Sequence, residues 1–304
     1  MHEGKPSYIK NTMLLIIGVV SVGFSSILIK WCSAPASIMG MYRLFFTLVI
    51  ITPMLRKLNL RSTLGELSRK EVILLLLSGS FLGIHFLFWM ESLALTSVAS
   101  SMIVLSLQPV FVMAGSFLLY RERTTGGGVI ALSVAVIGSA VTAWGDIGLS
   151  KVALYGDLLS LLGAIAASLY MVTGQKLVRR IPPIMYSYMV FLIGGVIMLI
   201  YNLVLRVPLF SYDRKDWILF LLLAIVPNIL GQMVFNKLMG QLGATTISMV
   251  IIAEPAVAII LATVLLHEEI ESLQVMGGII TLLGVGLFFW FKQMMIKRGS
   301  KRLI

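Results

Sequence analysis

The chain consists of long apolar runs separated by short polar segments. A helix needs about 20 mainly apolar residues to cross the hydrocarbon core of a bilayer. Ten runs of about this length follow one another along the sequence, which predicts an all-α integral membrane protein with ten transmembrane helices. The expected spans are residues 12–32, 36–55, 71–93, 98–120, 127–145, 154–176, 183–205, 216–238, 244–266 and 273–291.

The connections between the runs are short. The longest are residues 56–70 and 206–215, which leave no room for a soluble catalytic domain. The first run follows Lys5 and Lys10 and precedes Ala34-Pro35-Ala36, as in a signal peptide. It is about 20 residues long, however, where the apolar part of a signal peptide has about 7–15. We therefore expect it to remain as the first helix, with any function inside the bundle.

Composition supports a lipid environment. Of the 304 residues, 59% are apolar and 12% charged, and the mean hydropathy is +1.00, whereas a soluble domain is about 25% charged. The net charge of +11 lies mostly in the short segments between runs, so it predicts no nucleic-acid partner. With one cysteine, Cys32, we expect no internal disulfide, no metal site and no cofactor.

The distribution of Lys and Arg predicts the orientation. With the N-terminus inside, eighteen of these residues fall on the cytoplasmic side and four on the other, namely Lys151, Arg206, Arg214 and Lys215. Cytoplasmic loops of membrane proteins are enriched in Lys and Arg. We therefore expect a multi-pass protein of the plasma membrane with both termini in the cytoplasm.

The sequence also contains an internal repeat. Sliding it against itself by 146 residues aligns the first five runs with the last five without a gap, and the matches include Pro109 with Pro255 and Trp144 with Trp290. The predicted units are residues 1–146 and 147–304. Because five is odd, the second unit must cross the membrane in the opposite direction to the first. Such inverted repeats are the usual basis of alternating access in carriers.

Several residues of the first half form a sparse pattern that the second half repeats in part. In the first half these are Arg43 in Met41-Tyr42-Arg43-Leu44-Phe45, Ala94-Leu95 followed by Ala99, Pro109, Glu122 and Gly138; in the second they are Pro255, Glu268, Gly277-Gly278 and Gly284. With these residues the chain resembles, over nearly its whole length, the EamA-type members of the drug/metabolite transporter superfamily. The resemblance implies a ten-helix bundle around a central cavity, commonly exporting amino acids or related metabolites.

Two positions depart from the repeat pattern. The second half has Met189 where the first has Arg43, and its junction near residue 240 reads Met239-Gly240-Gln241-Leu242-Gly243-Ala244. Arg43 therefore has a role in one half only. Its planar guanidinium is predicted either to hold a substrate carboxylate or to bind another helix.

Polar side chains within spans are candidates for a substrate pathway, because they are costly to bury in lipid. His85 and Trp89 share one helix face with Phe81, and Asn228, Gln232 and Asn236 follow the same i, i+4, i+8 spacing after Pro227. For the amides and for His85 the alternative is hydrogen bonding to neighbouring helices. We expect at least one of the three amides to contact substrate.

Gln108-Pro109 and Glu254-Pro255 occupy equivalent positions in the two halves. Proline removes a backbone donor and weakens the helix locally, so Pro109 and Pro255 are predicted hinges. Glu254 is predicted to bind a substrate ammonium or to carry a coupling proton, with a fixed ion pair as the alternative.

These patterns favour a secondary transporter over an enzyme. There is no Gly-x-x-x-x-Gly-Lys-Ser/Thr motif for ATP, and neither Gly-x-Ser-x-Gly nor His-Glu-x-x-His occurs. The predicted partners are a small-molecule substrate and the lipid bilayer. The alternatives are a scaffold or regulatory subunit that transports nothing and, less favoured, a membrane-embedded enzyme. The sequence leaves a homodimer open.

Overall fold

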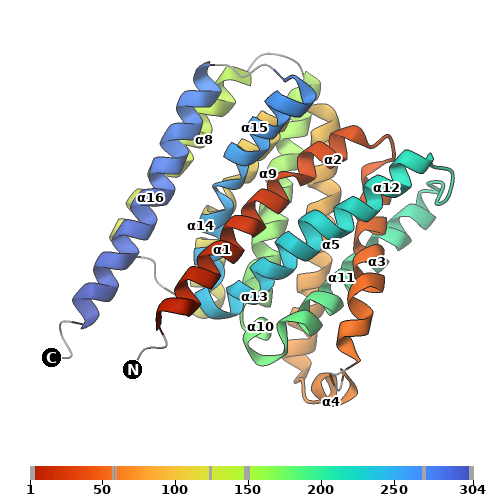
Figure 1. Cartoon of the computed structure of the whole chain (residues 1–304), viewed down its shortest axis with the longest axis horizontal. Coiled ribbons are helices and arrows are strands. Elements are labelled where there is room, and N and C mark those ends of the chain that lie inside the picture. The colour runs from red at the N-terminus through yellow and green to blue at the C-terminus, as the bar shows by residue number, and fades with distance from the viewer. Residues whose placement is uncertain are drawn as a thin grey trace.

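The computed structural model describes residues 4–56, 58, 60–122, 125–146, 151–268 and 272–300, and every regular element among these residues is a helix (Figure 1). The helices are α1 Gly4–Gly23, α2 Ser25–Trp31, α3 Ala36–Leu55, α4 Leu60–Gly65, α5 Arg69–Leu95, α6 Val98–Leu105, α7 Gln108–Tyr120, α8 Gly126–Asp146, α9 Lys151–Gly174, α10 Leu177–Arg180, α11 Pro183–Val204, α12 Arg214–Leu223, the π-helix η1 Ala224–Gln232, α13 Met233–Leu242, α14 Ala244–Ile251, α15 Glu254–Leu266 and α16 Ser272–Ser300.

Eight helical stretches are long and apolar enough to cross a membrane, which supports a multi-pass membrane protein. They are Ile9–Trp31, Ala36–Leu55, Arg69–Leu95, Val98–Tyr120, Lys151–Arg180, Pro183–Val204, Arg214–Leu242 and Ala244–Leu266. The two other expected spans fall within α8 and α16, where the apolar stretches over described residues are shorter, Gly126–Val141 and Val275–Phe288. The count of ten crossings therefore stays a prediction. The connection 56–70, expected as a loop, contains the short helix α4.

Two of the apolar runs are broken at equivalent places. α6 ends at Leu105 and α7 begins at Gln108, while α14 ends at Ile251 and α15 begins at Glu254. Pro109 and Pro255 lie in the first turn of α7 and α15, where a missing N–H is tolerated because it would have no partner within the helix. Beside the prolines the α-helix gives way to a tighter turn, in which the Leu107 N–H donates to the Val104 carbonyl and the Ala253 N–H to the Val250 carbonyl.

A third irregularity lies in the run that carries the three amides. Between α12 and α13 the backbone forms η1, in which the Met233 N–H donates to the Asn228 carbonyl five residues earlier. Pro227 lies inside this segment and has no N–H to donate. The wider turn alters the simple four-residue spacing, and Asn228 points to α3, whereas Gln232 and Asn236 both bond to Tyr170 of α9.

The two halves meet in a reciprocal contact between α8 and α16, which lie side by side along one edge of the bundle (Figure 1). A Cβ on Gly138 would collide with the backbone at Thr281 and Gly277, and a Cβ on Gly284 would collide with the backbone at Ala135 and Ala131. Thr281 is equivalent to Ala135 in the repeat, Gly277 to Ala131 and Gly284 to Gly138. Equivalent residues therefore exchange places across an antiparallel helix pair.

The remaining helices pack around a large buried apolar cluster contributed by both halves. α5 packs along α9 and α11, and α3 packs on α11 and η1. α1 begins and α16 ends at the same end of the bundle, where α4 and α10 also lie (Figure 1). This arrangement leaves a small cavity between the helices near the breaks, which is the candidate site.

Candidate functional site

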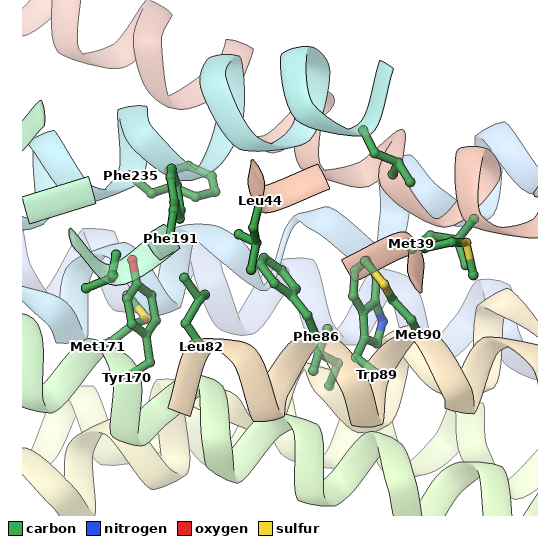
Figure 2. Close-up of a cluster of buried hydrophobic side chains, with 14 of the residues drawn as sticks. Met39, Leu44, Leu82, Phe86, Trp89, Met90, Tyr170, Met171, Phe191 and Phe235 are labelled. Carbon is green, nitrogen blue, oxygen red and sulfur yellow. The ribbon is translucent and has the colours of Figure 1, made fainter. Parts of the chain in front are cut away.

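The candidate site is a cavity enclosed mainly by aromatic and aliphatic side chains. Figure 2 shows Phe86 and Trp89 on α5, Tyr170 and Met171 on α9, and Phe235 on α13 within this region. The space that the centres of water molecules can occupy is about 40 Å³. The lining residues are Val22, Arg43, Leu82, His85, Phe86, Trp89, Leu105, Gln108, Ala167, Tyr170, Met171, Gln232, Phe235, Ile251 and Glu254.

The cavity is built from equivalent positions of the two repeats. Four pairs of lining residues are 146 positions apart: Phe86 with Gln232, Trp89 with Phe235, Leu105 with Ile251, and Gln108 with Glu254. The backbone positions are thus shared by the two halves, but the charges are not. The first half contributes Arg43 where the second has Met189, and the second contributes Glu254 where the first has Gln108.

Arg43 is a buried cation held by neutral partners. It is 2% exposed, its Nε donates to Asn228 Oδ1 at 3.0 Å, and its Nη2 donates to the same oxygen. Its Nη1 donates to Ser25 Oγ at 3.4 Å, and its guanidinium lies 4.0 Å from the centre of the Phe86 ring. An arginine has five N–H groups, and these three bonds leave two for another ligand.

Asn228 is itself fixed on both sides of its amide. Its Nδ2 donates to the Arg43 carbonyl at 3.3 Å and to Thr47 Oγ1 at 3.1 Å. Thr47 in turn donates to the Arg43 carbonyl at 2.7 Å. The amide therefore bridges η1 to α3 and orients the guanidinium through a single oxygen.

Glu254 is the acidic counterpart of Arg43 on the cavity wall. It is 3% exposed, and its Oε1 has no hydrogen-bond partner. Arg43 interacts with it through space, but the one ion pair within 4.0 Å among the described residues joins Arg180 to Glu71 elsewhere. Glu254 begins α15, and the partial positive charge of a helix N-terminus favours a carboxylate there. The site thus holds a basic and an acidic side chain that are not hydrogen-bonded to each other.

His85 and Trp89 lie on one face of α5, as the spacing predicts. Their rings are stacked with centres 5.8 Å apart and planes 4° from parallel. His85 Nδ1 lies 3.0 Å from the Gly163 carbonyl; since a carbonyl only accepts, Nδ1 carries the proton and Nε2 of the neutral ring is an acceptor. Trp89 Nε1 is buried without a partner. Trp89, a residue of the cavity wall, therefore has an unused donor.

The side-chain amides at and behind the cavity wall belong to separate hydrogen-bond networks. Gln108 Nε2 donates to Met171 Sδ at 2.9 Å. Gln232 Nε2 donates to Tyr170 Oη at 3.1 Å, and Tyr170 donates to Asn236 Oδ1. Asn236 Nδ2 then donates to Ser187 Oγ at 3.0 Å. Tyr170 is thus fixed at the cavity wall by two amides of the neighbouring segment.

Of the residues predicted from the sequence, six line the cavity: Arg43, His85, Trp89, Gln108, Gln232 and Glu254. The other two do not line the cavity: Asn228 accepts a hydrogen bond from Arg43, and Asn236 accepts one from Tyr170. The cavity also contains Tyr170, Phe86, Met171 and Phe235, which the pattern of polar residues in the sequence does not indicate. Phe235 could have been found as the repeat equivalent of Trp89, but Tyr170 carries no such signal because its equivalent is Phe24. Among the described residues, no group of three or more His, Cys, Asp or Glu is placed to hold a metal.

The chain is similar to known transporters. A model of the EamA-like transporter family matches the chain twice, over residues 10–144 and 154–290. A probable amino-acid metabolite efflux pump of Salmonella typhimurium is 26% identical over 232 residues, covering 72% of this chain and 77% of the relative. An uncharacterized transporter of Clostridium kluyveri is also 26% identical, and the alignment covers 62% of each chain.

A further uncharacterized transporter, from Archaeoglobus fulgidus, is 27% identical, with 60% of this chain and 64% of the relative aligned. The chain thus spans somewhat less than two thirds of the length of the Clostridium and Archaeoglobus relatives. A solved crystal structure superposes with a TM-score of 0.73 and 15% identity, covering 93% of this chain and 98% of that one. At 15% identity the superposition shows only that the two folds are similar.

Proposed function

The chain belongs to the EamA-like transporter family, and on that premise we propose that it is a secondary transporter that exports a small zwitterionic metabolite, an amino acid or a related compound, across the cell membrane. Homology favours a transporter over an enzyme. The direction of transport follows the Salmonella relative, whose name describes an efflux pump.

The observation that carries the substrate class is the pair of unpaired opposite charges on one cavity. Arg43 has two N–H groups left for a ligand, and Glu254 has a carboxylate oxygen with no partner. A buried charge is costly unless a hydrogen-bonded counter-charge satisfies it. A substrate carboxylate on Arg43 and a substrate ammonium on Glu254 would satisfy both groups at once. The indole N–H of Trp89 adds a donor for the same carboxylate.

The small size of the cavity supports a closed state of an alternating-access cycle. About 40 Å³ open to the centres of water molecules is a small space for a substrate. Substrate entry therefore requires the helices around the cavity to move apart. The interruptions before Gln108 and before Glu254 adjoin the cavity on opposite repeats, and we propose Pro109 and Pro255 as the hinges of this motion.

We further propose ten crossings, with residues 1–146 and 147–304 as inverted five-helix units. The reciprocal antiparallel contact of Gly138 and Gly284 supports a two-fold axis between the halves, and such an axis in the membrane plane relates inverted repeats. Both termini are placed in the cytoplasm. In support, α1 begins and α16 ends at the same end of the bundle, together with the arginines of α10 (Figure 1).

Transport by purified protein tests the proposal. Proteoliposomes are loaded with a panel of labelled amino acids and related metabolites, and the same compounds are screened for an increase in the melting temperature of the detergent-solubilised protein. We expect at least one zwitterion to be transported and to stabilise the protein. Glu254→Gln should abolish both effects, whereas Glu91→Gln, the same chemical change at an exposed carboxylate of α5, should retain them. No transport and no ligand-dependent stabilisation for any compound would favour the scaffold role.

The dependence of transport on pH decides whether Glu254 also carries a coupling proton. Arg43, His85 and Tyr170 are the other ionisable groups on this cavity. If Glu254 exchanges its proton for substrate, wild-type flux follows an imposed pH gradient, and any residual flux of Glu254→Gln at high substrate concentration does not. Residual flux that still follows the gradient would leave Glu254 with substrate binding only.

A further inference from the structure

The π-helical segment η1 places Asn228 beside Arg43 of the cavity wall. Asn228 does not line the cavity, yet its Oδ1 accepts both the Nε and the Nη2 hydrogens of Arg43. These are the donors on one edge of the guanidinium. An arginine that used this edge for Glu254 would form a two-bond ion pair and would leave no free carboxylate for a ligand.

Among the described residues, nothing else that contacts Arg43 is a comparable acceptor. Its other polar contact among these residues is Ser25 Oγ at the longer distance of 3.4 Å, and its guanidinium lies 4.0 Å from the centre of the Phe86 ring. Without Asn228, two donors of a buried cation would lack partners, at the usual high cost of an unpaired buried charge. Glu254, an opposite charge that lacks a partner on the same cavity, would then be the strongest available acceptor.

The geometry of η1 is what brings Asn228 to this position. The wide turn is closed by the bond from Met233 N–H to the Asn228 carbonyl, and Thr47 receives the Asn228 amide on α3. Single π-type turns within α-helices are rare and are frequent at functional sites. Here the segment carries an amide whose hydrogen bonds are all spent on α3.

From these contacts we propose that Asn228 is a positioning residue, which acts through Arg43 to keep the guanidinium apart from Glu254 and so keeps the carboxylate free for a substrate cation. The effect on substrate binding rests on the proposed transport function. The separation of Arg43 from Glu254 does not depend on it. Loss of Asn228 converts two ligand-binding charges into an internal ion pair.

The repeat supplies matched substitutions for a test that needs no substrate. Arg43→Met, Glu254→Gln and Asn228→Leu each introduce the residue found at the equivalent position of the other half, namely Met189, Gln108 and Leu82. A double-mutant cycle between positions 43 and 254 is measured by melting temperature, once with Asn228 present and once in the Asn228→Leu background. Such a cycle isolates the interaction between two residues.

We expect the effects of Arg43→Met and Glu254→Gln to be nearly additive with Asn228 present and strongly non-additive in the Asn228→Leu background. Equal coupling in the two backgrounds would overturn the proposal. If Asn228→Leu does not accumulate as folded protein, Thr47→Val, which removes one of the two acceptors of the Asn228 amide, is used in the same comparison. It should give a smaller increase in coupling, and unchanged coupling would again overturn the proposal.

Transport separates positioning from a merely structural role. For any zwitterion that the wild type carries, Asn228→Leu should raise the KM at least ten-fold with little change in kcat, whereas Asn228→Asp, which still accepts from Arg43, should restore the KM. A fall in kcat with unchanged KM would contradict the proposal. If the wild type carries none of the compounds, the proposed function fails, but the melting-temperature cycle still decides how Asn228 acts.

Discussion

At the scale of single residues, the site contains polar atoms that the fold leaves without partners. A buried polar atom without a hydrogen bond costs about 1–3 kcal/mol, so few are retained. The side chains of the described residues leave four such atoms, and two of them, Trp89 Nε1 and Glu254 Oε1, belong to residues that line the cavity. Tyr170 differs, because two amides hold its hydroxyl.

This difference predicts opposite results for two similar substitutions. Trp89→Phe removes a donor that has no partner, so the melting temperature should stay the same or rise while substrate affinity falls several-fold. Tyr170→Phe leaves the amides of Gln232 and Asn236 without their shared partner and should lower stability by about 1–3 kcal/mol. Thermal unfolding and ligand titration of both variants check this. A loss of stability in Trp89→Phe without a loss of affinity would refute the assignment of the indole.

At the scale of elements, interruptions of the helices coincide with the cavity. The breaks after Leu105 and after Ile251 place both of these residues, and the helix starts at Gln108 and Glu254, on the cavity wall. An interrupted helix can change the angle between its two parts at lower cost than a continuous one. We therefore propose that the prolines act in this motion.

Replacing both Pro109 and Pro255 with Ala should close the breaks. Alanine restores the missing backbone donors and removes the steric conflict, so the variant should fold but turn over more slowly. Initial rates in proteoliposomes and melting temperatures of the single and double variants measure the effect. An unchanged turnover rate would leave the prolines with a structural role only.

The contact between α8 and α16 gives a second prediction at this scale. Gly284→Ala places a methyl group 2.6 Å from the Ala135 nitrogen, whereas Gly286 has nothing within 4 Å of its Cβ position. Overpacking of a tight contact costs about 1–3 kcal/mol. Gly284→Ala should lower the melting temperature clearly, and Gly286→Ala should not. Equal effects would mean that the close approach of the two helices is not needed for stability.

At the scale of the whole molecule, orientation is the property to test. Cys32 is replaced by Ser to give a cysteine-free chain; burial already raises the pKa of its thiol to about 12, so it is mostly protonated and reacts slowly at neutral pH. Single cysteines are then introduced at positions 65, 180, 148 and 212, of which 148 lies outside the described residues. A membrane-impermeant maleimide applied to intact cells should label 148 and 212 but not 65 and 180. Labelling that splits either pair would reject ten crossings with cytoplasmic termini.

The sequence by itself determined the fold class, because the length of an apolar run that crosses a bilayer is set by the thickness of the bilayer. It also determined the helix breaks, since proline acts locally, and the repeat, which is visible as a constant offset of 146 residues. Six cavity residues were predicted from one rule: a polar side chain within a membrane span is costly and therefore marks a candidate functional site. All of these inferences use local chemistry.

The tertiary structure decided which polar groups share the cavity and which hold other groups in place. The spacing of Asn228, Gln232 and Asn236 indicates a common face, but η1 turns Asn228 toward α3. Likewise, Arg43 and Glu254 are far apart in the sequence, and only packing shows that they line one cavity without forming an ion pair. Such facts depend on the relative placement of several helices, so no single segment of the chain encodes them.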